Sequence, residues 1–368
     1  GETQDLNKLM VETGSAWGRR AEYFVMALDD DQTIYGQILG ADPKAIIDRK
    51  LPEEHRIFLK QSYRVPRQVH RVALDCIERV SHRMPKEYLP RVDEDGRAAE
   101  GSVTRLDAGS WKNPQPIVDA AKRDLDDGYS VMFLTTCSFM LAPLIKVLRD
   151  DAIPFKNQYR RSNGAWNPIR REAAGAASNR IMALLAAHPI SGEHQRAWSY
   201  GDVASWAEWL EAKGIMQRGA KKLLTTLPAE APADEMGLLQ IFEEKALDEM
   251  LAAFEGSHAD LIQWWRSHLS KSFQARADYP ARIAEVRGLD ALLDEPEVTV
   301  GTIHSVKGGQ ADKVYLFLDL SPEGWREYER RGVPQDSVLR AIYVGITRAY
   351  EGLNICPQAS PVAVSLQI

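Results

Sequence analysis

The sequence predicts an α/β fold, in which a parallel sheet flanked by helices is interrupted by an all-helical insertion. Two observations predict it. A β-rich run at Ser130–Thr136 precedes a helical stretch at Phe139–Arg149 and a second strand at Ile153–Tyr159, which is the spacing of a βαβ unit. Residues 165–293 are then rich in Ala, Leu, Glu and Trp, with helical periodicity, and strand character returns only afterwards.

The first elements of the chain lead to an acidic tripeptide. After a helical stretch, the apolar run Tyr23–Leu28 is typical of a buried strand and ends in Asp29-Asp30-Asp31. Carboxylates at the C-terminal end of a strand are common in the sites of open α/β sheets, although these residues also suit a helix N-cap or a turn. Pro66 begins an amphipathic helix that we expect to reach about Arg83, with an apolar face of Val69, Val72, Ala73, Ile77 and Val80.

The last elements complete the predicted sheet. Val298–Ile303 and Val314–Leu318 are expected strands, Ser337–Tyr350 an expected helix, and Leu353–Cys356 a closing strand. The expected domain boundaries give four segments, of which the third is the helical insertion: residues 1–50, 51–164, 165–293 and 294–368. The insertion carries tryptophans at helical spacing, which favours a hydrophobic core over a base-stacking platform: Trp198, Trp206, Trp209, Trp264 and Trp265.

The net charge of −6, from 46 basic and 52 acidic residues, does not by itself indicate a nucleic-acid binder. Phosphate binding needs only a local basic surface. One basic patch is present, and it suits either a solvated loop face or a phosphate-contacting surface: Lys156, Arg160, Arg161, Arg170, Arg171 and Arg180.

Membrane and metal sites find no support in the sequence. The longest apolar runs, such as Ile181–Ala187, are too short to span a bilayer, and no signal peptide is visible. Cys76, Cys137 and Cys356 lie far apart, which suits a reducing compartment and gives no metal-ligand spacing. We therefore expect a cytoplasmic protein with no membrane partner and no metal ligands of its own.

Two stretches near the end carry the chemistry. Thr302-Ile303-His304-Ser305-Val306-Lys307-Gly308 follows a predicted strand, and the sequence LRAIYVGITRA occupies positions 339–349. Arg348 is expected on a helix above Tyr343 and Val344, which would hold its guanidinium at a domain edge. There it could stabilise the charge of a transferring phosphoryl group, although a surface salt bridge is the more ordinary role.

Together these stretches resemble motifs V and VI of the UvrD/Rep-like superfamily 1 DNA helicases. Other segments resemble further motifs of that family, in its order: Glu2-Thr3-Gln4-Asp5 the tail of motif II, Asp29–Tyr35 motif III, and Gln61-Ser62-Tyr63-Arg64 motif IV. The resemblance spans nearly the whole chain and is weakest in the helical insertion. It implies that residues 1–50 are a remnant of a first RecA-like domain and that the sheet belongs to a second RecA-like domain.

The resemblance also implies roles in ATP hydrolysis. Glu2 would act as the base that polarises the attacking water. Gln4 and Gln32 would sense the γ-phosphate, which Arg64 and Arg348 would reach from the second RecA-like domain. Tyr63 would stack on the adenine, and Gln310 would hydrogen-bond a ribose hydroxyl. The resemblance assigns DNA contacts to Tyr35, Thr302, His304 and Lys307. Taken singly, Tyr63 also suits a core tyrosine, and His304 a structural histidine.

The chain departs from the family at three places. It has no phosphate-binding loop of the form G-x-x-x-x-G-K-[ST], and Gly1 stands where the magnesium-binding Asp is expected. No aromatic residue follows Tyr35 closely, and Gln310 replaces a glutamate. We therefore expect ATP and Mg²⁺ to need a missing N-terminal half, in cis or in trans, and the isolated chain to lack ATPase activity.

The expected function is that of the C-terminal part of an ATP-dependent 3′–5′ DNA helicase, acting on single-stranded DNA or 3′-tailed duplex. The alternative is a non-catalytic DNA- or partner-binding module derived from a helicase. A helicase–nuclease of the RecB/AddA type is disfavoured, because too few residues follow Arg348 for a nuclease domain.

Overall fold

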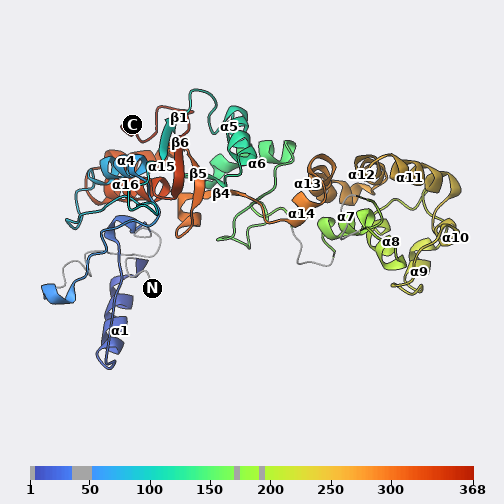
Figure 1. The fold of residues 1–368 in the computed structure, drawn as a ribbon, viewed down its shortest axis with the longest axis horizontal. Helices are drawn as coiled ribbons and strands as arrows, with labels where there is room; N and C mark the ends of the chain where they lie inside the picture. The colour runs from blue at the N-terminus through green and yellow to red at the C-terminus, as the bar shows by residue number, and fades with distance from the viewer. Residues whose placement is uncertain (1–4, 35–51, 170–174, 190–194) are drawn as a thin grey trace. The chain divides into compact units, whose positions relative to one another are not determined.

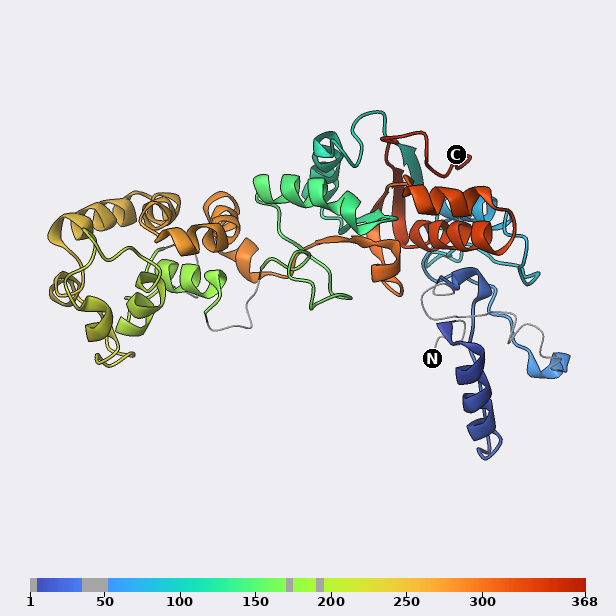
Figure 2. The same cartoon turned by 180° about the vertical axis from the view of Figure 1, so that it is seen from behind.

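The computed structural model describes residues 5–34, 52–169, 175–189 and 195–368 (Figure 1; Figure 2). The chain forms two compact units. Residues 1–147, 157–160 and 297–368 form the first, here called the sheet unit, and residues 148–156 and 161–296 form the second, here called the helical unit. Glu2, Gln4 and Tyr35 lie outside the described residues.

The described residues form an all-parallel six-stranded sheet, so the predicted α/β fold with a parallel sheet is confirmed. The strands are β1 (Ser102–Arg105), β2 (Val131–Thr135), β3 (Phe155–Lys156), β4 (Val298–Thr302), β5 (Ala311–Leu316) and β6 (Ala349–Ile355). Their order is β1-β6-β5-β2-β4-β3. All of β2 is buried, as expected for a central parallel strand covered by helices on both faces.

The first part of the chain and the segments between the strands form helices. They are α1 (Lys8–Gly18), α4 (Arg67–Ile77), α5 (Gln115–Asp126), α6 (Leu141–Asp150), α15 (Pro322–Glu329) and α16 (Val333–Ile346). Short 3₁₀ turns lie at η2 (Asp30–Gln32), η3 (Glu53–His55), η4 (Ser138–Met140) and η5 (Ile303–Val306). In open α/β sheets, sites form at the loops that follow the carboxyl ends of the strands.

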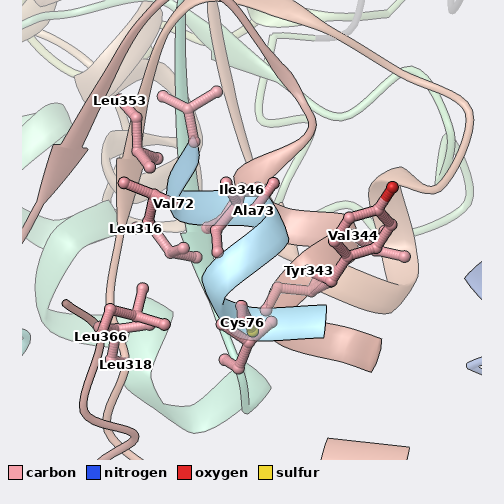
Figure 3. Close-up of a cluster of buried hydrophobic side chains, with 14 of the residues drawn as sticks. Val72, Ala73, Cys76, Leu316, Leu318, Tyr343, Val344, Ile346, Leu353 and Leu366 are labelled. Carbon is pink, nitrogen blue, oxygen red and sulfur yellow. The ribbon is translucent and has the colours of Figure 1, made fainter. Parts of the chain in front are cut away.

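The core of the sheet unit lies where α4 and α16 meet the sheet (Figure 3). Val72, Ala73 and Cys76 of α4 pack among residues of β5, β6 and α16, and all are at most 1% exposed. All five residues of the predicted apolar face are buried; Val69, Val72, Ala73 and Ile77 lie on α4, and Val80 follows its end. The helix ends at Ile77 and not near Arg83, because the next backbone N–H groups bind elsewhere: Ser81 and His82 donate to the carboxylate of Asp336.

The helical unit contains α7 (Ala177–Leu185), α8 (Tyr200–Ala207), α9 (Ala220–Leu224), α10 (Glu235–Leu239), α11 (Glu244–Gly256), α12 (His258–Ser267), α13 (Lys271–Arg287) and α14 (Asp290–Leu293). Its tryptophans form a core, as the sequence favoured. The ring of Trp206 stacks on Phe242 with centroids 5.4 Å apart, and Trp209 stacks on Phe273 at 4.7 Å. None of the five tryptophans is more than 7% exposed.

Three expected elements differ in the structure. Tyr23–Leu28 is not a strand: Tyr23 and Val25 are 83% and 88% exposed, and no strand in the described ranges pairs with this run. The last helix runs over Val333–Ile346, so Arg348 lies in the turn before β6 and not on the helix. The strand expected at Ile153–Tyr159 keeps only Phe155–Lys156, because the chain turns at Asn157, whose carbonyl accepts from Arg160 N.

Among the helices of the described ranges, none is long and apolar enough to cross a membrane.

Candidate functional site

Arg348 is buried beside a backbone carbonyl of the segment that precedes β5. Its side chain is 1% exposed, although the residues alone favoured a surface salt bridge. Nε donates to the Val344 carbonyl at 2.9 Å, and Nη1 donates to the Gly309 carbonyl at 3.1 Å. The turn that ends α16 therefore fixes the guanidinium inside the sheet unit, with one edge directed at Gly309.

Arg64 approaches the same carbonyl from another segment. Its Nη1 donates to the Gly309 carbonyl at 3.4 Å. Its Nε is buried and has no hydrogen-bond partner among the described residues. Burial lowers the pKa of Arg64, since no carboxylate offsets the desolvation of its charge. Two guanidiniums thus share one neutral acceptor and keep a donor unsatisfied, which makes the position favourable for an anion.

Hydrogen bonds between the side chains of Ser62 and Arg91 and the backbone around Arg64 fix the position from which the Arg64 side chain extends. The Ser62 hydroxyl accepts from Arg64 N at 3.2 Å and from Val65 N at 2.9 Å, which forms a tight turn before α4. Arg91 Nε donates to the Arg64 carbonyl at 3.1 Å. Between Ser62 and Arg64 the Tyr63 ring points outward and is 86% exposed, so the reading of Tyr63 as a core tyrosine is wrong.

Gln32 connects the arginine pair with the acidic tripeptide. Arg348 Nη2 donates to Gln32 Oε1 at 3.3 Å, and Gln32 Nε2 donates to Asp29 Oδ2 at 2.7 Å. Gln32 is the last residue of η2, which Asp29 caps by accepting from Asp31 N at 3.2 Å. The structure therefore brings Gln32, Arg64 and Arg348 together, although they lie far apart in sequence.

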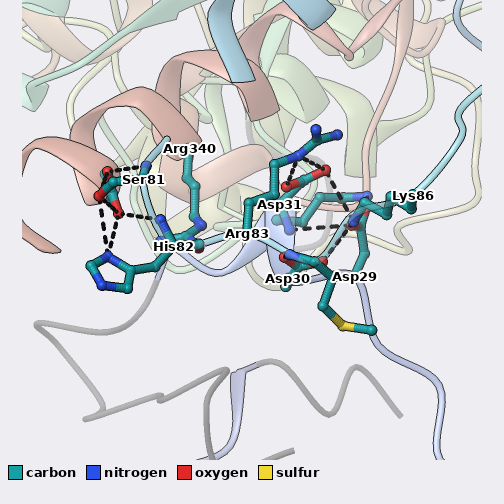
Figure 4. A network of polar contacts seen from close by, with 11 residues as sticks. Asp29, Asp30, Asp31, Ser81, His82, Arg83, Lys86 and Arg340 are labelled. Carbon is teal, nitrogen blue, oxygen red and sulfur yellow. Dashed lines mark hydrogen bonds and ion pairs between the residues drawn. The ribbon is translucent and has the colours of Figure 1, made fainter. Parts of the chain in front are cut away.

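The acidic tripeptide is neutralised by two cations from the segment after α4 (Figure 4). Lys86 Nζ lies 2.5, 2.7 and 3.0 Å from carboxylate oxygens of Asp29, Asp30 and Asp31, and Arg83 Nε lies 2.8 Å from Asp31. Burial alone would lower the pKa of Lys86, but the three carboxylates outweigh it and raise the pKa. Asp29 caps η2, as one interpretation of the sequence expected, and the ion pairs of the tripeptide fix the position of η2, which ends at Gln32.

The segment that follows β4 places three further predicted residues. Thr302 caps η5 by accepting from Ser305 N at 3.3 Å. His304 Nε2 bonds the Ile34 carbonyl at 3.2 Å, and burial lowers its pKa. Lys307 Nζ lies 2.5 Å from both carboxylate oxygens of Asp5, and its side chain is only 5% exposed. His304 and Lys307 thus tie η5 to the first described residues, whereas Gln310 is exposed.

The predicted basic patch is not one surface. Arg180 is 6% exposed, lies over the Trp209 ring at 4.6 Å, and is paired with Glu208 at 2.6 Å, so it belongs to the core of the helical unit. Lys156 is paired with Glu295 at 2.6 Å. Arg170 and Arg171 lie outside the described residues.

Sequence reasoning missed the residues that hold the site together. Lys86 and Arg83 lie more than fifty positions from the carboxylates they bind, and no local pattern indicates such pairs. Gly309 was likewise not predicted as a site residue. It is the second glycine of the pair Gly308-Gly309, and a Cβ atom there would lie 2.6 Å from Cζ of Tyr159.

No protein-family model matches the chain, and a search of curated proteins found no significant match. The resemblance to UvrD/Rep-like helicases thus stays a prediction made from the motifs.

Proposed function

We propose that this chain is part of an ATP-dependent 3′–5′ DNA helicase and supplies the arginines of the second motor domain. The observation that carries the proposal is the convergence of Arg64 and Arg348 on one carbonyl, beside Gln32. A γ-phosphate offers several charged acceptors in place of the neutral Gly309 carbonyl, and charge-assisted hydrogen bonds are about twice as strong as neutral ones. The unsatisfied Nε of Arg64 fits such a ligand.

The other nucleotide contacts in the proposal come from exposed side chains. Tyr63 presents its ring for stacking on an adenine, and Gln310 is available to a ribose hydroxyl. The carboxylates of Asp29–Asp31 are already paired with Lys86 and Arg83, which disfavours their use as Mg²⁺ ligands. Mg²⁺ and the phosphate loop would be supplied by the missing N-terminal half, and the hydrolytic base in the proposal is Glu2 of this chain.

The proposed DNA contacts are those of Tyr35, Thr302 and His304, on single-stranded DNA or the tail of a 3′-tailed duplex. The hydroxyl of Thr302 keeps its proton for a phosphate oxygen while its oxygen accepts from Ser305 N. Lys307 has a different part in the proposal: its ion pair with Asp5 joins the segment after β4 to the motif II-like segment.

A nucleotide-binding measurement with matched arginine variants tests the proposal. We expect Arg64→Ala to weaken binding of a fluorescent ATP analogue, measured with an N-terminal half added to the chain, by about tenfold, the effect of losing one charge-assisted hydrogen bond. Arg67→Ala is the control, because Arg67 is 63% exposed and is paired with Glu100 on the surface. Equal affinities of the two variants would contradict the assignment of the arginine pair.

A second experiment separates the helicase from its alternative. We expect no ATP hydrolysis by the chain alone, and DNA-stimulated hydrolysis after addition of an N-terminal half that carries a phosphate loop. Unwinding of 3′-tailed and not of 5′-tailed duplex would then support the polarity. Binding of single-stranded DNA without hydrolysis by the combined halves would instead favour the non-catalytic binding module.

A further inference from the structure

A tyrosine without a role in the proposed function packs onto the glycine of the arginine pair. Tyr159 is half-buried against the core of the sheet unit. A Cβ atom at Gly309 would lie 2.6 Å from Cζ of Tyr159, so the ring lies directly against the Gly309 backbone. The φ angle of Gly309 is one that other residues adopt, and so the ring contact, not the backbone conformation, requires glycine here.

Asn157 fixes the segment that carries this ring. Its side chain is fully buried, and Oδ1 accepts from Tyr159 N at 3.0 Å. Nδ2 donates to a carbonyl of β4 at 2.8 Å and to the Ser305 hydroxyl at 3.1 Å. Gly309 N donates to the Val306 carbonyl at 2.9 Å. The ring and the glycine are thus anchored to the same 3₁₀ turn, η5.

The Tyr159 phenol also lies close enough to Arg64 to affect the pKa of its guanidinium. Burial lowers the pKa of Arg64, and the phenol of Tyr159 is one of three tyrosines that partly offset this effect, with Tyr88 and Tyr343. No carboxylate takes part in this balance. Because the Gly309 carbonyl is the acceptor that both guanidiniums share, its position depends on what supports the Gly309 backbone from the other side.

We propose that Tyr159 is a positioning residue that sets the Gly309 carbonyl against Arg64 and Arg348. The inference rests on the proposed function, since the ligand assigned to the arginines is a polyphosphate. When a polyphosphate takes the donors of the two guanidiniums, the Gly309 carbonyl loses both of its hydrogen bonds, and the Tyr159 ring becomes the main support of that backbone.

The test observes the two guanidiniums directly in the full chain. Nε–Hε signals of Arg64 and Arg348 are assigned by NMR with Arg64→Lys and Arg348→Lys, and are then recorded without any anion. We expect Tyr159→Ala to shift both signals, because the atoms nearest to Gly309 are Oη, Cζ and Cε2 of Tyr159. Tyr159→Phe keeps Cζ and Cε2 and loses only Oη, so we expect it to shift the signals less. Tyr129→Ala is the control, an aromatic truncation at a residue that faces Lys313 instead.

A reciprocal variant keeps the test independent of the folding of Tyr159→Ala. Gly309→Ala places a methyl group against the ring, so we expect it to shift the same two signals, and Tyr159→Ala/Gly309→Ala to relieve that effect. Arginine signals unchanged by both single variants would overturn the positioning role.

Titration with inorganic pyrophosphate separates the two proposals. Arginine signals of the unmodified chain that do not respond to pyrophosphate would overturn the proposed function. A response in the unmodified chain, with affinity lowered about tenfold in Tyr159→Ala and lowered less in Tyr159→Phe, supports the positioning role. Equal affinities of the unmodified chain and Tyr159→Ala would overturn this inference alone.

Discussion

Arg348 Nη2 donates a hydrogen bond to Gln32 Oε1 at 3.3 Å, across 316 positions of sequence. The same glutamine donates to Asp29 at 2.7 Å, and Asp29 is bound by Lys86. Residues assigned to separate motifs therefore belong to one polar network. We therefore expect a substitution at any residue of this network to alter the hydrogen bonds of the arginine pair.

The first prediction concerns Gln32 as the connecting residue. We expect Gln32→Ala to lower the free energy of unfolding by about 1–2 kcal/mol, since two hydrogen bonds to charged groups are lost. A double-mutant cycle with Arg348→Lys should give a coupling energy of about 1 kcal/mol in urea denaturation. Gln115→Ala is the control, because Gln115 bonds the exposed Asp119. A coupling energy near zero would show that the Gln32–Arg348 contact carries no stability.

The second prediction distinguishes the structural role of Lys307 from a role in DNA binding. We expect Lys307→Met to lower the free energy of unfolding by about 3 kcal/mol, because the largely buried Asp5 carboxylate, 17% exposed, loses its ion pair with Lys307. Asp5→Asn/Lys307→Met should recover part of this loss. Lys60→Met, at an exposed pair with Glu87, should change stability by less than about 1 kcal/mol.

Binding of single-stranded DNA provides the other half of the Lys307 test. An ammonium group that contacts a phosphate contributes to the salt dependence of binding, whereas one held by Asp5 does not. We expect the salt dependence to be the same in Lys307→Met and the unmodified chain. A stable variant with a reduced salt slope would place Lys307 on the DNA.

The third prediction is a loss of stability at acidic pH. Burial lowers the pKa of His70 and of His304, so the unfolded chain binds more protons just below the ordinary histidine value of about 6.5. Their contribution to stability is complete above that pH and is lost as the pH falls through the folded values. Urea midpoints should therefore decrease between about pH 7 and pH 5.

Matched histidine variants assign this pH effect. His70→Gln keeps a donor for the Tyr88 carbonyl, which His70 Nε2 contacts at 2.7 Å, and should reduce the pH dependence of the midpoint. His304→Gln should do the same. His55→Gln, at an exposed residue, should leave it unchanged. A pH dependence that survives in both buried-site variants would exclude these histidines as its source.

The fourth prediction concerns thiol reactivity. Burial raises the pKa of the Cys76 thiol to about 12 and that of Cys356 well above its ordinary value, whereas Cys137 is partly exposed. Because the thiolate is the reactive form, an aromatic disulfide reagent at pH 8 should modify Cys137 first and the other two only in urea. Cys137→Ser should abolish the fast phase. Rapid modification of Cys76 in the native chain would contradict its burial.

The sheet apart from β1 was predictable, because its other strands are short apolar runs with the spacing of βαβ units, whereas β1 (Ser102–Arg105) is not an apolar run and was not predicted. Val69, Val72 and Val80 were predictable as core because a helix repeats every 3.6 residues. Tyr23–Leu28 has the same apolar character and is not a strand, since a strand also needs a hydrogen-bonding neighbour that its own sequence cannot specify.

The site was predictable only as far as its motifs reach. The motif resemblance named Gln32, Arg64 and Arg348, and the structure places them together. It did not indicate that Arg348 is buried in a turn, because helix ends depend on tertiary contacts. Nor did it indicate Lys86 or Tyr159, whose partners lie more than fifty positions away in the chain.

Because Arg64 and Arg348 already donate to the Gly309 carbonyl, an anion must replace this acceptor in order to bind them. Chloride and other monovalent ions accept weakly and from a single centre, so they compete poorly with an acceptor that already sits within 3.4 Å of both guanidiniums. An anion with several oxygens can engage both cations at once and displace it. The resting chain should therefore discriminate against the small ions of the cell by the number of acceptor atoms that a ligand offers.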